Sequence, residues 1–153
     1  MKKDNNIFIR DGRAPIPRNV NISRVMSANR AKNTKPELLI RNELYKREIR
    51  GYRIHPKNIP GKPDIALTRN KIGIFINGCF WHRCPYCKLK IPQSNKYFWE
   101  NKFAKNKERD KRKIYELKRM GWVTLTLWEC QIKKDVNKQI LKIEKKIKDK
   151  DAK

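Results

Sequence analysis

Four cysteines place the strongest constraint on the fold of this chain. Cys79, Cys84 and Cys87 follow a C-x4-C-x2-C pattern, and Cys130 comes much later, directly after a strand-like run. A tetrahedral Zn²⁺ site needs four such ligands, and the tight C-P-Y-C turn supplies two neighbouring ones. Four unrelated thiols, or a redox pair in the C-x2-C, are the alternatives. We predict a structural zinc site, which requires the fold to bring Cys130 beside the other three cysteines.

The rest of the sequence indicates a reducing compartment for these cysteines. The N-terminal stretch MKKDNNIFIRDGRAPIP has neither the apolar core nor the small-residue cleavage site of a secretory signal. No apolar run reaches the roughly 18 residues of a membrane span. We therefore expect a cytoplasmic protein without a membrane partner, whose cysteines are metal ligands or free thiols rather than disulfides.

A large positive charge favours nucleic acid as the partner. The 153-residue chain carries 40 Lys and Arg against 15 Asp and Glu, a formal net charge of +25. A field of this sign and size concentrates polyanions at the protein surface. The alternative is a lysine-rich, solvated surface that reflects composition alone.

Apolar and turn patterns predict an α/β domain. Thr34 and Glu37 have the spacing of a capping box at the start of an amphipathic helix in NTKPELLIRNELYKRE. Two further helices are expected over residues 96–120, closed by Gly121, and 135–149. Short β-rich runs bounded by Gly, Pro or Asn predict four strands, at residues 51–55, 63–67, 71–76 and 123–129. We divide the chain into a flexible basic arm (1–21), one domain (22–134) and a basic C-terminal helix and tail (135–153).

Two polar residues stand out as candidates for chemistry. In PGKPDIAL, Asp64 begins an apolar run without a helix to cap, which suits a metal ligand or a partner for a cation. A surface turn is the alternative for Asp64. His82 lies among the cysteines, and because four cysteines already satisfy a zinc ion, its imidazole is free for other work. A further residue around the zinc or a surface imidazole is the alternative for His82.

Five stretches of the chain resemble the very short patch repair (Vsr) DNA mismatch endonucleases, across nearly all of residues 22–131. They are MSANRAKNTKPELLIRNEL, PGKPDIAL, IFINGCFWHRCPYC, NKYFWENKFAKNKERD and GWVTLTLWEC. The resemblance implies a restriction-endonuclease-like α/β fold, with a central mixed sheet flanked by helices and a structural zinc. It also implies a Mg²⁺-dependent nick in one strand of double-stranded DNA, beside the thymine of a T:G mismatch. Such a protein would act as a monomer at the nucleoid, with mismatch-repair proteins as further partners.

The resemblance assigns catalytic roles to three residues. Asp64 matches the family's metal-binding aspartate, assisted by the backbone carbonyl of Ile76, and His82 matches the catalytic histidine that would act as general base. Glu37 matches a helix glutamate near the active site that would order waters. For Glu37 the capping box is an equally good explanation, and one side chain can serve both purposes.

The resemblance also implies a DNA-binding surface. Phe80 and Trp81 correspond to aromatic residues that insert beside the mismatch, and Met26 corresponds to an apolar wedge from the opposite side. Ordinary core packing is the alternative for the two aromatic residues. Spacings of three and four place further candidates on one side of the 96–120 helix: Trp99, Lys102, Asn106 and Arg109. The lysine and the arginine among them would contact phosphates.

Asn77 departs from the family pattern. Many members carry an acidic residue or a histidine just before G-C-F-W-H, so this chain lacks an ionisable group there. The second acidic residue and the lysine of the common D…(D/E)-x-K nuclease pattern are also missing at FING. We predict a strand-nicking mismatch endonuclease. The alternatives are a restriction-type or other non-mismatch endonuclease on the same fold, and an inactive, zinc-stabilised protein that binds duplexes or mismatches.

Overall fold

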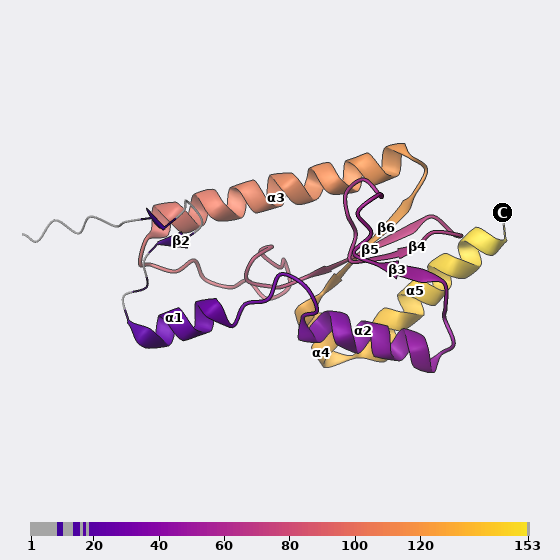
Figure 1. Cartoon of the computed structure of the whole chain (residues 1–153), viewed down its shortest axis with the longest axis horizontal. Coiled ribbons are helices and arrows are strands. Elements are labelled where there is room, and N and C mark those ends of the chain that lie inside the picture. Colours follow the sequence, from indigo (N-terminus) through magenta and orange to yellow (C-terminus); the bar gives the residue numbers. More distant parts are fainter. Residues whose placement is uncertain (1–8, 11–13, 16, 18, 153) are drawn as a thin grey trace, which may run out of the picture.

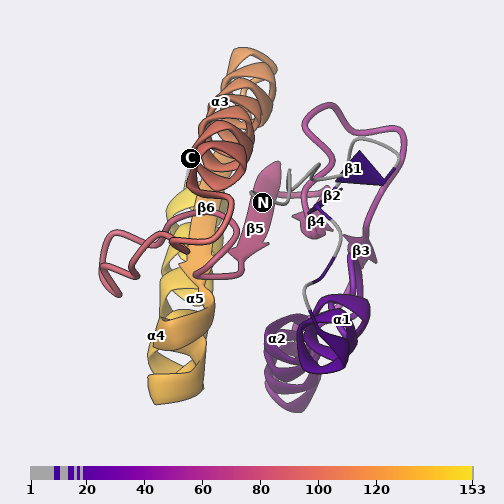
Figure 2. The same ribbon diagram turned by 90° about the vertical axis from the view of Figure 1, so that its left-hand side faces the viewer.

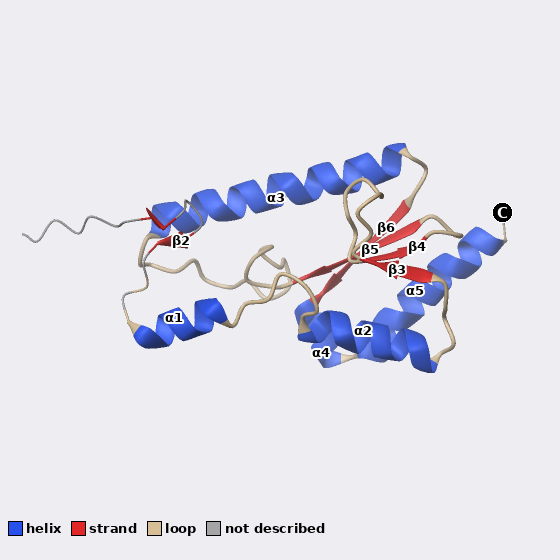
Figure 3. Ribbon diagram, viewed as in Figure 1, coloured by secondary structure: helices blue, strands red, loops and turns tan. Residues whose placement is uncertain are grey.

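A four-stranded mixed sheet forms the centre of the fold. The computed structural model of the chain describes residues 9–10, 14–15, 17 and 19–152. The strands lie in sequence order across the sheet, as β3 (Tyr52–Ile54), β4 (Ile65–Leu67), β5 (Ile72–Asn77) and β6 (Val123–Trp128). The pairs β3–β4 and β4–β5 are antiparallel, whereas β5 and β6 are parallel (Figure 3).

Helices cover both faces of this sheet. The long helix α3 (Lys96–Arg119) lies on one face, as Figures 1 and 2 show. The other face is covered by α2 (Lys35–Lys46), α4 (Glu129–Lys134) and α5 (Val136–Asp151). The predicted α/β class, with a mixed sheet flanked by helices, is therefore confirmed.

The central strands are buried on both faces because their alternate residues face different helices. One set packs against α2 and α5 in a core formed by Ile40, Leu44, Ile65, Leu67, Ile72, Ile74, Ile76, Ile140 and Ile143. The other set faces α3, where Ala66 and Phe75 form a second buried cluster with Leu117. Gly73 lets α3 approach closely, since a Cβ there would lie 2.8 Å from Leu117 Cδ1. The nearly continuous apolar run of β5 is typical of a strand covered from both sides.

The crossover from β5 to β6 determines where the cysteines lie. β5 ends at Asn77, an irregular loop over residues 78–95 follows, and α3 then returns the chain to the start of β6. Because β5 and β6 are parallel and Asn77 pairs with Trp128, their carboxyl ends lie side by side. The start of the loop, with Cys79, is thereby placed beside Cys130.

Some elements differ from those expected. Helix α1 (Val20–Ser27) was not predicted; its apolar Val20 and Val25 are exposed, and the Asn19 side chain caps it by accepting from Ile22 N at 2.9 Å. The short α4 occupies the end of a predicted strand. Two-residue strands β1 (Ile9–Arg10) and β2 (Ala14–Pro15) pair within the predicted arm over residues 1–21, most of which lies outside the described residues.

None of the helices in the described ranges is long and apolar enough to cross a membrane.

Candidate active site

Strand pairing places Asp64 and His55 next to each other. His55 directly follows β3 and Asp64 directly precedes β4, and the His55 backbone N–H donates to the Asp64 carbonyl at 3.0 Å. The Asp64 N–H donates to the carbonyl of Ile74 at 2.9 Å, so the backbone of Asp64 continues the sheet ladder. Its side chain is fixed as well, because Oδ2 accepts from the N–H of Ile76 at 2.7 Å. The prediction for Ile76 concerned its carbonyl as a metal ligand, whereas the contact that the structure shows is made by its N–H; the carbonyl's role stays a prediction.

Glu37 accepts hydrogen bonds at the start of α2, and its carboxylate also lies beside His55 and Asp64. Its carboxylate accepts from the backbone N–H of Asn33 at 3.0 Å and from the Thr34 hydroxyl at 2.9 Å. This arrangement differs from a standard capping box, since the glutamate reaches the residue before the N-cap. The side chain is buried, with its residue only 4% exposed. Glu37 therefore combines hydrogen bonds at the start of α2 with a position inside the protein.

Glu37, His55 and Asp64 form a cluster that fits a divalent cation. One ligand atom from each lies within 4.8 Å of the others. Burial, and secondarily the negative charge of Glu37, raises the pKa of Asp64, against the opposing effect of the Ile76 N–H. Two carboxylates held together in a partly dehydrated place are stabilised when a cation binds between them. Sequence reasoning missed His55, whose only signal was its place at the end of a strand-like run.

His82 lies outside this cluster and pairs with a different carboxylate. Its Nδ1 is 2.5 Å from Oδ2 of Asp110, which projects from α3. The His82 backbone N–H also donates to the carbonyl of Gly78 at 3.2 Å, which tightens the loop around the ring. A carboxylate at Nδ1 leaves Nε2 as the free nitrogen. Asp110 is the last residue of the stretch NKYFWENKFAKNKERD, and no role was predicted for it.

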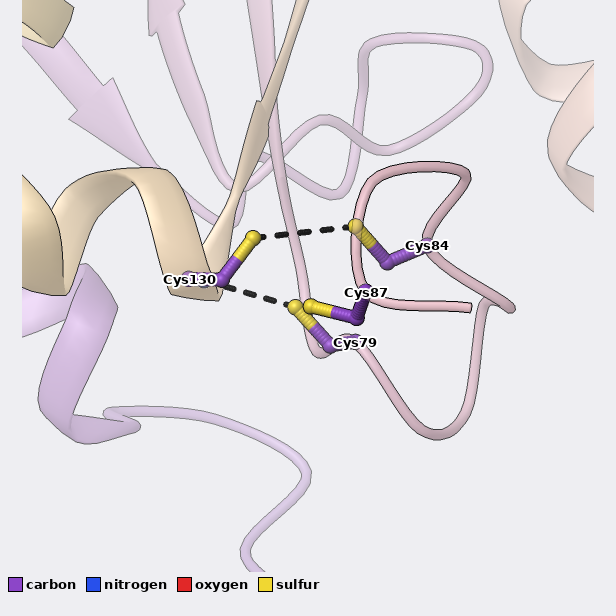
Figure 4. A group of neighbouring side chains, drawn as sticks. All are labelled: Cys79, Cys84, Cys87 and Cys130. Atoms are coloured by element: carbon purple, nitrogen blue, oxygen red, sulfur yellow. Dashed lines mark hydrogen bonds between the residues drawn. The ribbon is translucent and has the colours of Figure 1, made fainter. Parts of the chain in front are cut away.

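The four cysteines gather as predicted (Figure 4). Their sulfur atoms all lie within 4.8 Å of one another, with Cys84 Sγ 3.7 Å from Cys130 Sγ. All four are free thiols. Although burial opposes it, N–H groups of Cys87 and Tyr86 lower the pKa of Cys84, whereas burial raises the pKa of Cys79. Four thiols at these separations can hold one metal ion.

A cluster of aromatic rings adjoins the cysteine loop. Phe80 meets Trp81, Trp99 and Phe103 edge-on, with ring centroids 5.1, 5.3 and 5.3 Å apart respectively. Phe80 and Trp81 remain only half-buried, whereas Phe103 is buried. The two adjacent aromatic residues therefore share one partly open cluster at the first turns of α3, and neither belongs to the core of the sheet.

The other residues expected at DNA occupy different environments. Asn106 is buried, and its amide donates to the carbonyl of Trp81 at 3.0 Å and accepts from Arg109 at 3.0 Å. In the structure, Asn106 therefore supports the loop that carries Trp81. Arg109 is exposed and Lys102 is half-buried on the same helix. Met26 is half-buried on α1, which extends beyond the sheet at the same end as the start of α3 (Figure 1).

Comparisons with known proteins are consistent with this geometry. The family model described as DNA mismatch endonuclease Vsr matches residues 18–88. The type II nicking enzyme V.NmeAIP of Neisseria meningitidis serogroup A is 43% identical over 109 residues, covering 71% of this chain and 77% of the relative. V.NaeI, a type II nicking enzyme of Lentzea aerocolonigenes, is 39% identical over 77% of this chain and 73% of its own length. The DNA mismatch endonuclease Vsr of Escherichia coli K12 is 38% identical over 54% of this chain and 53% of its own length.

Proposed function

The chain belongs to the Vsr family of DNA mismatch endonucleases, and from that premise we propose that it nicks one DNA strand beside the thymine of a T:G mismatch, using Mg²⁺, in very short patch repair. That it is an endonuclease acting on DNA phosphodiester bonds follows from the family. The observation that carries the proposal is the Asp64 carboxylate, which the Ile76 N–H fixes beside buried Glu37. Cutting one strand needs only a monomer, and the proposed place of action is the nucleoid.

Asp64 and the backbone carbonyl of Ile76 would hold the Mg²⁺ ion. When bound, such an ion neutralises charge that develops on the phosphate and activates water. The Ile76 N–H binds Asp64 Oδ2, so Oδ1 is the oxygen that remains to face a ligand. Glu37 Oε1 accepts from the Thr34 hydroxyl, and Oε2, which also accepts from the Asn33 N–H, lies 3.0 Å from His55 Nε2, where it would order water.

His82 is the proposed general base. Its Nε2 would take a proton from the attacking water, while Asp110 holds the ring through Nδ1 and stabilises the imidazolium that forms. The pairing fixes both the tautomer and the direction of the ring. Asp110 is therefore a positioning residue that acts through His82.

Replacing Asp110 with asparagine is expected to lower kcat for nicking about a hundredfold, because a neutral amide no longer stabilises the protonated ring. KM for DNA should stay within about twofold, since the DNA-facing charges are retained. Steady-state nicking of a labelled duplex measures both. The exposed Glu108→Gln on the same helix serves as the control. A higher KM with unchanged kcat would contradict the positioning role.

The half-open aromatic cluster supplies the proposed mismatch sensor. Phe80 and Trp81 would insert beside the T:G pair, where poor pairing makes unstacking less costly, and Met26 would enter from the other side. Lys102 and Arg109 would contact phosphates, and Asn106 would hold the loop through the Trp81 carbonyl. The four cysteines would bind a structural Zn²⁺ that fastens this loop to the end of β6.

Mismatch specificity can be tested with two duplexes that differ only at one base pair. The protein is incubated in Mg²⁺ with a T:G or a C:G duplex, and the nick is mapped on a denaturing gel. We expect cleavage beside the mismatched thymine alone. Trp81→Ala should lower the preference about tenfold, because a stacking contact contributes about 1–3 kcal/mol. Equal cleavage of both duplexes at a fixed sequence would instead identify a sequence-directed nicking enzyme.

A further inference from the structure

His55 offers a buried nitrogen that no described residue satisfies. Its Nε2 is inaccessible to solvent and has no hydrogen-bond partner among the residues that the structure describes. The nearest charged oxygen, Glu37 Oε2, lies 3.0 Å away but out of line for a hydrogen bond, and Nδ1 is 3.6 Å from Asp64 Oδ1. Leaving a buried polar atom without a hydrogen bond costs free energy, unless a ligand takes the place of the missing partner. The side chain is only 16% exposed, so bulk water is a poor substitute.

The spacing of these atoms suits coordination of a shared ion. Two ligand atoms that each lie about 2.1 Å from an octahedral cation, at right angles, are about 3.0 Å apart. The separation of His55 Nε2 from Glu37 Oε2 has this value. Oδ2 of Asp64 is bound to the Ile76 N–H, so Oδ1 is the oxygen left for a ligand; it lies 3.6 Å from the other ring nitrogen of His55, Nδ1. Each of the three residues thus offers one ligand atom, and these atoms lie within 4.8 Å of one another, close enough to share one ion.

We propose that Glu37, His55 and Asp64 together form a mixed nitrogen and oxygen site that binds a first-row transition-metal dication, such as Mn²⁺, more tightly than Mg²⁺. Imidazole is a borderline-soft ligand that favours transition metals, whereas an all-oxygen site favours Mg²⁺. The chain has two histidines, and the other one is held by Asp110. The inference rests on the proposed nuclease site; it adds His55 as a metal ligand and gives Glu37 a direct contact with the ion in place of its water-ordering role.

The test measures metal binding without DNA. Zinc-loaded protein is titrated with Mn²⁺, and free Mn²⁺ is followed by electron paramagnetic resonance; Mg²⁺ affinity is obtained by competition. We expect one Mn²⁺ per chain at this site and a loss of about tenfold or more in Mn²⁺ affinity for His55→Gln, with Mg²⁺ affinity changed much less. Glu37→Gln should weaken Mn²⁺ binding, whereas Glu43→Gln on the same helix should not. Thermal melting of each metal-free variant confirms that it is folded.

Separate results would overturn the inference and the proposed function. Equal Mn²⁺ affinity in wild type and His55→Gln, or equal losses for Mn²⁺ and Mg²⁺, would remove His55 as a selective ligand, while Mg²⁺-dependent nicking of a T:G duplex would still support the nuclease. Conversely, His55-dependent Mn²⁺ binding in a protein that nicks no duplex in either metal would support the site and contradict the proposed function.

Discussion

Replacing Asp64 with asparagine is expected to reduce nicking of a T:G duplex in Mg²⁺ at least about a thousandfold, which corresponds to about 4 kcal/mol of transition-state stabilisation. Asparagine has nearly the same shape, and its carbonyl oxygen can accept the Ile76 N–H that the aspartate accepts at 2.7 Å. The loop geometry should therefore survive, and only the negative charge facing the metal is removed. Nicking rates at saturating enzyme measure the effect.

The same variant should not lose stability, which separates a catalytic role from a structural one. Burial, followed by the charge of Glu37, raises the pKa of Asp64 above its ordinary value. A raised pKa in the fold means that ionising Asp64 costs free energy in the metal-free protein once the pH exceeds the pKa of the unfolded chain. Asparagine avoids that cost, so the Tm without metal should equal or exceed that of the wild type.

A matched control is available on α5. Asp149→Asn removes one exposed carboxylate far along the chain and should leave nicking unchanged. If Asp64→Asn kept most of the activity, Asp64 would not be the metal ligand. If it lost activity together with several degrees of Tm, the loss would reflect the fold instead of the chemistry.

Local sequence patterns were sufficient for the parts of the site that depend on short segments. The C-P-Y-C turn and the strand before Cys130 predicted a cysteine cluster, and the sulfur atoms do lie within 4.8 Å of one another. Asp64 was identifiable because an acidic residue at the start of a buried strand needs a partner. Glu37 was assigned through the family resemblance, since its position in the first turn of a helix is explained equally well by capping.

The residues that sequence reasoning missed depend on tertiary pairing. His55 ends an unremarkable YRIH run, and only the pairing of β3 with β4 brings it to Asp64. Asp110 lies in a strongly basic helix, where the sequence suggests only that a carboxylate pairs with neighbouring lysines. Its contact with His82 arises because α3 packs along the loop that follows β5. Spacing along the chain carries no signal for either contact.

Asn106 illustrates a different limit, because a residue on the expected side of a helix is buried. Its spacing from Trp99 and Lys102 was correct, but helical periodicity cannot tell a DNA-facing side from one that faces a loop. The carbonyl of Trp81 needs a donor in that partly buried place, and the Asn106 amide supplies it at 3.0 Å. A buried amide that satisfies a backbone carbonyl is a structural feature.

Removing the metal from the four cysteines is expected to cause the second large effect. We expect about one Zn per chain by elemental analysis, and a drop of about 10 °C in Tm when a strong chelator removes it, because structural zinc contributes several kcal/mol of folding free energy. The loop over residues 78–95 has no helix or strand, so its attachment depends on the cysteines and the aromatic cluster. Cys130 is the anchor, since it lies in the first turn of α4, which directly follows β6, and its N–H donates to Cys79 Sγ at 3.3 Å.

Cys130→Ser tests whether this anchoring is the reason for the stability. The variant should contain less than one Zn, melt at about the temperature of the chelated wild type, and show no further change when chelator is added. Its mismatch preference should also fall, because the loop that carries Phe80 and Trp81 loses its attachment to the sheet. Chelation that lowers the Tm of both proteins equally would place the stabilising metal elsewhere. Four thiols that react freely with a thiol reagent in the native wild type would rule out the zinc site, since bound thiolates are protected from modification.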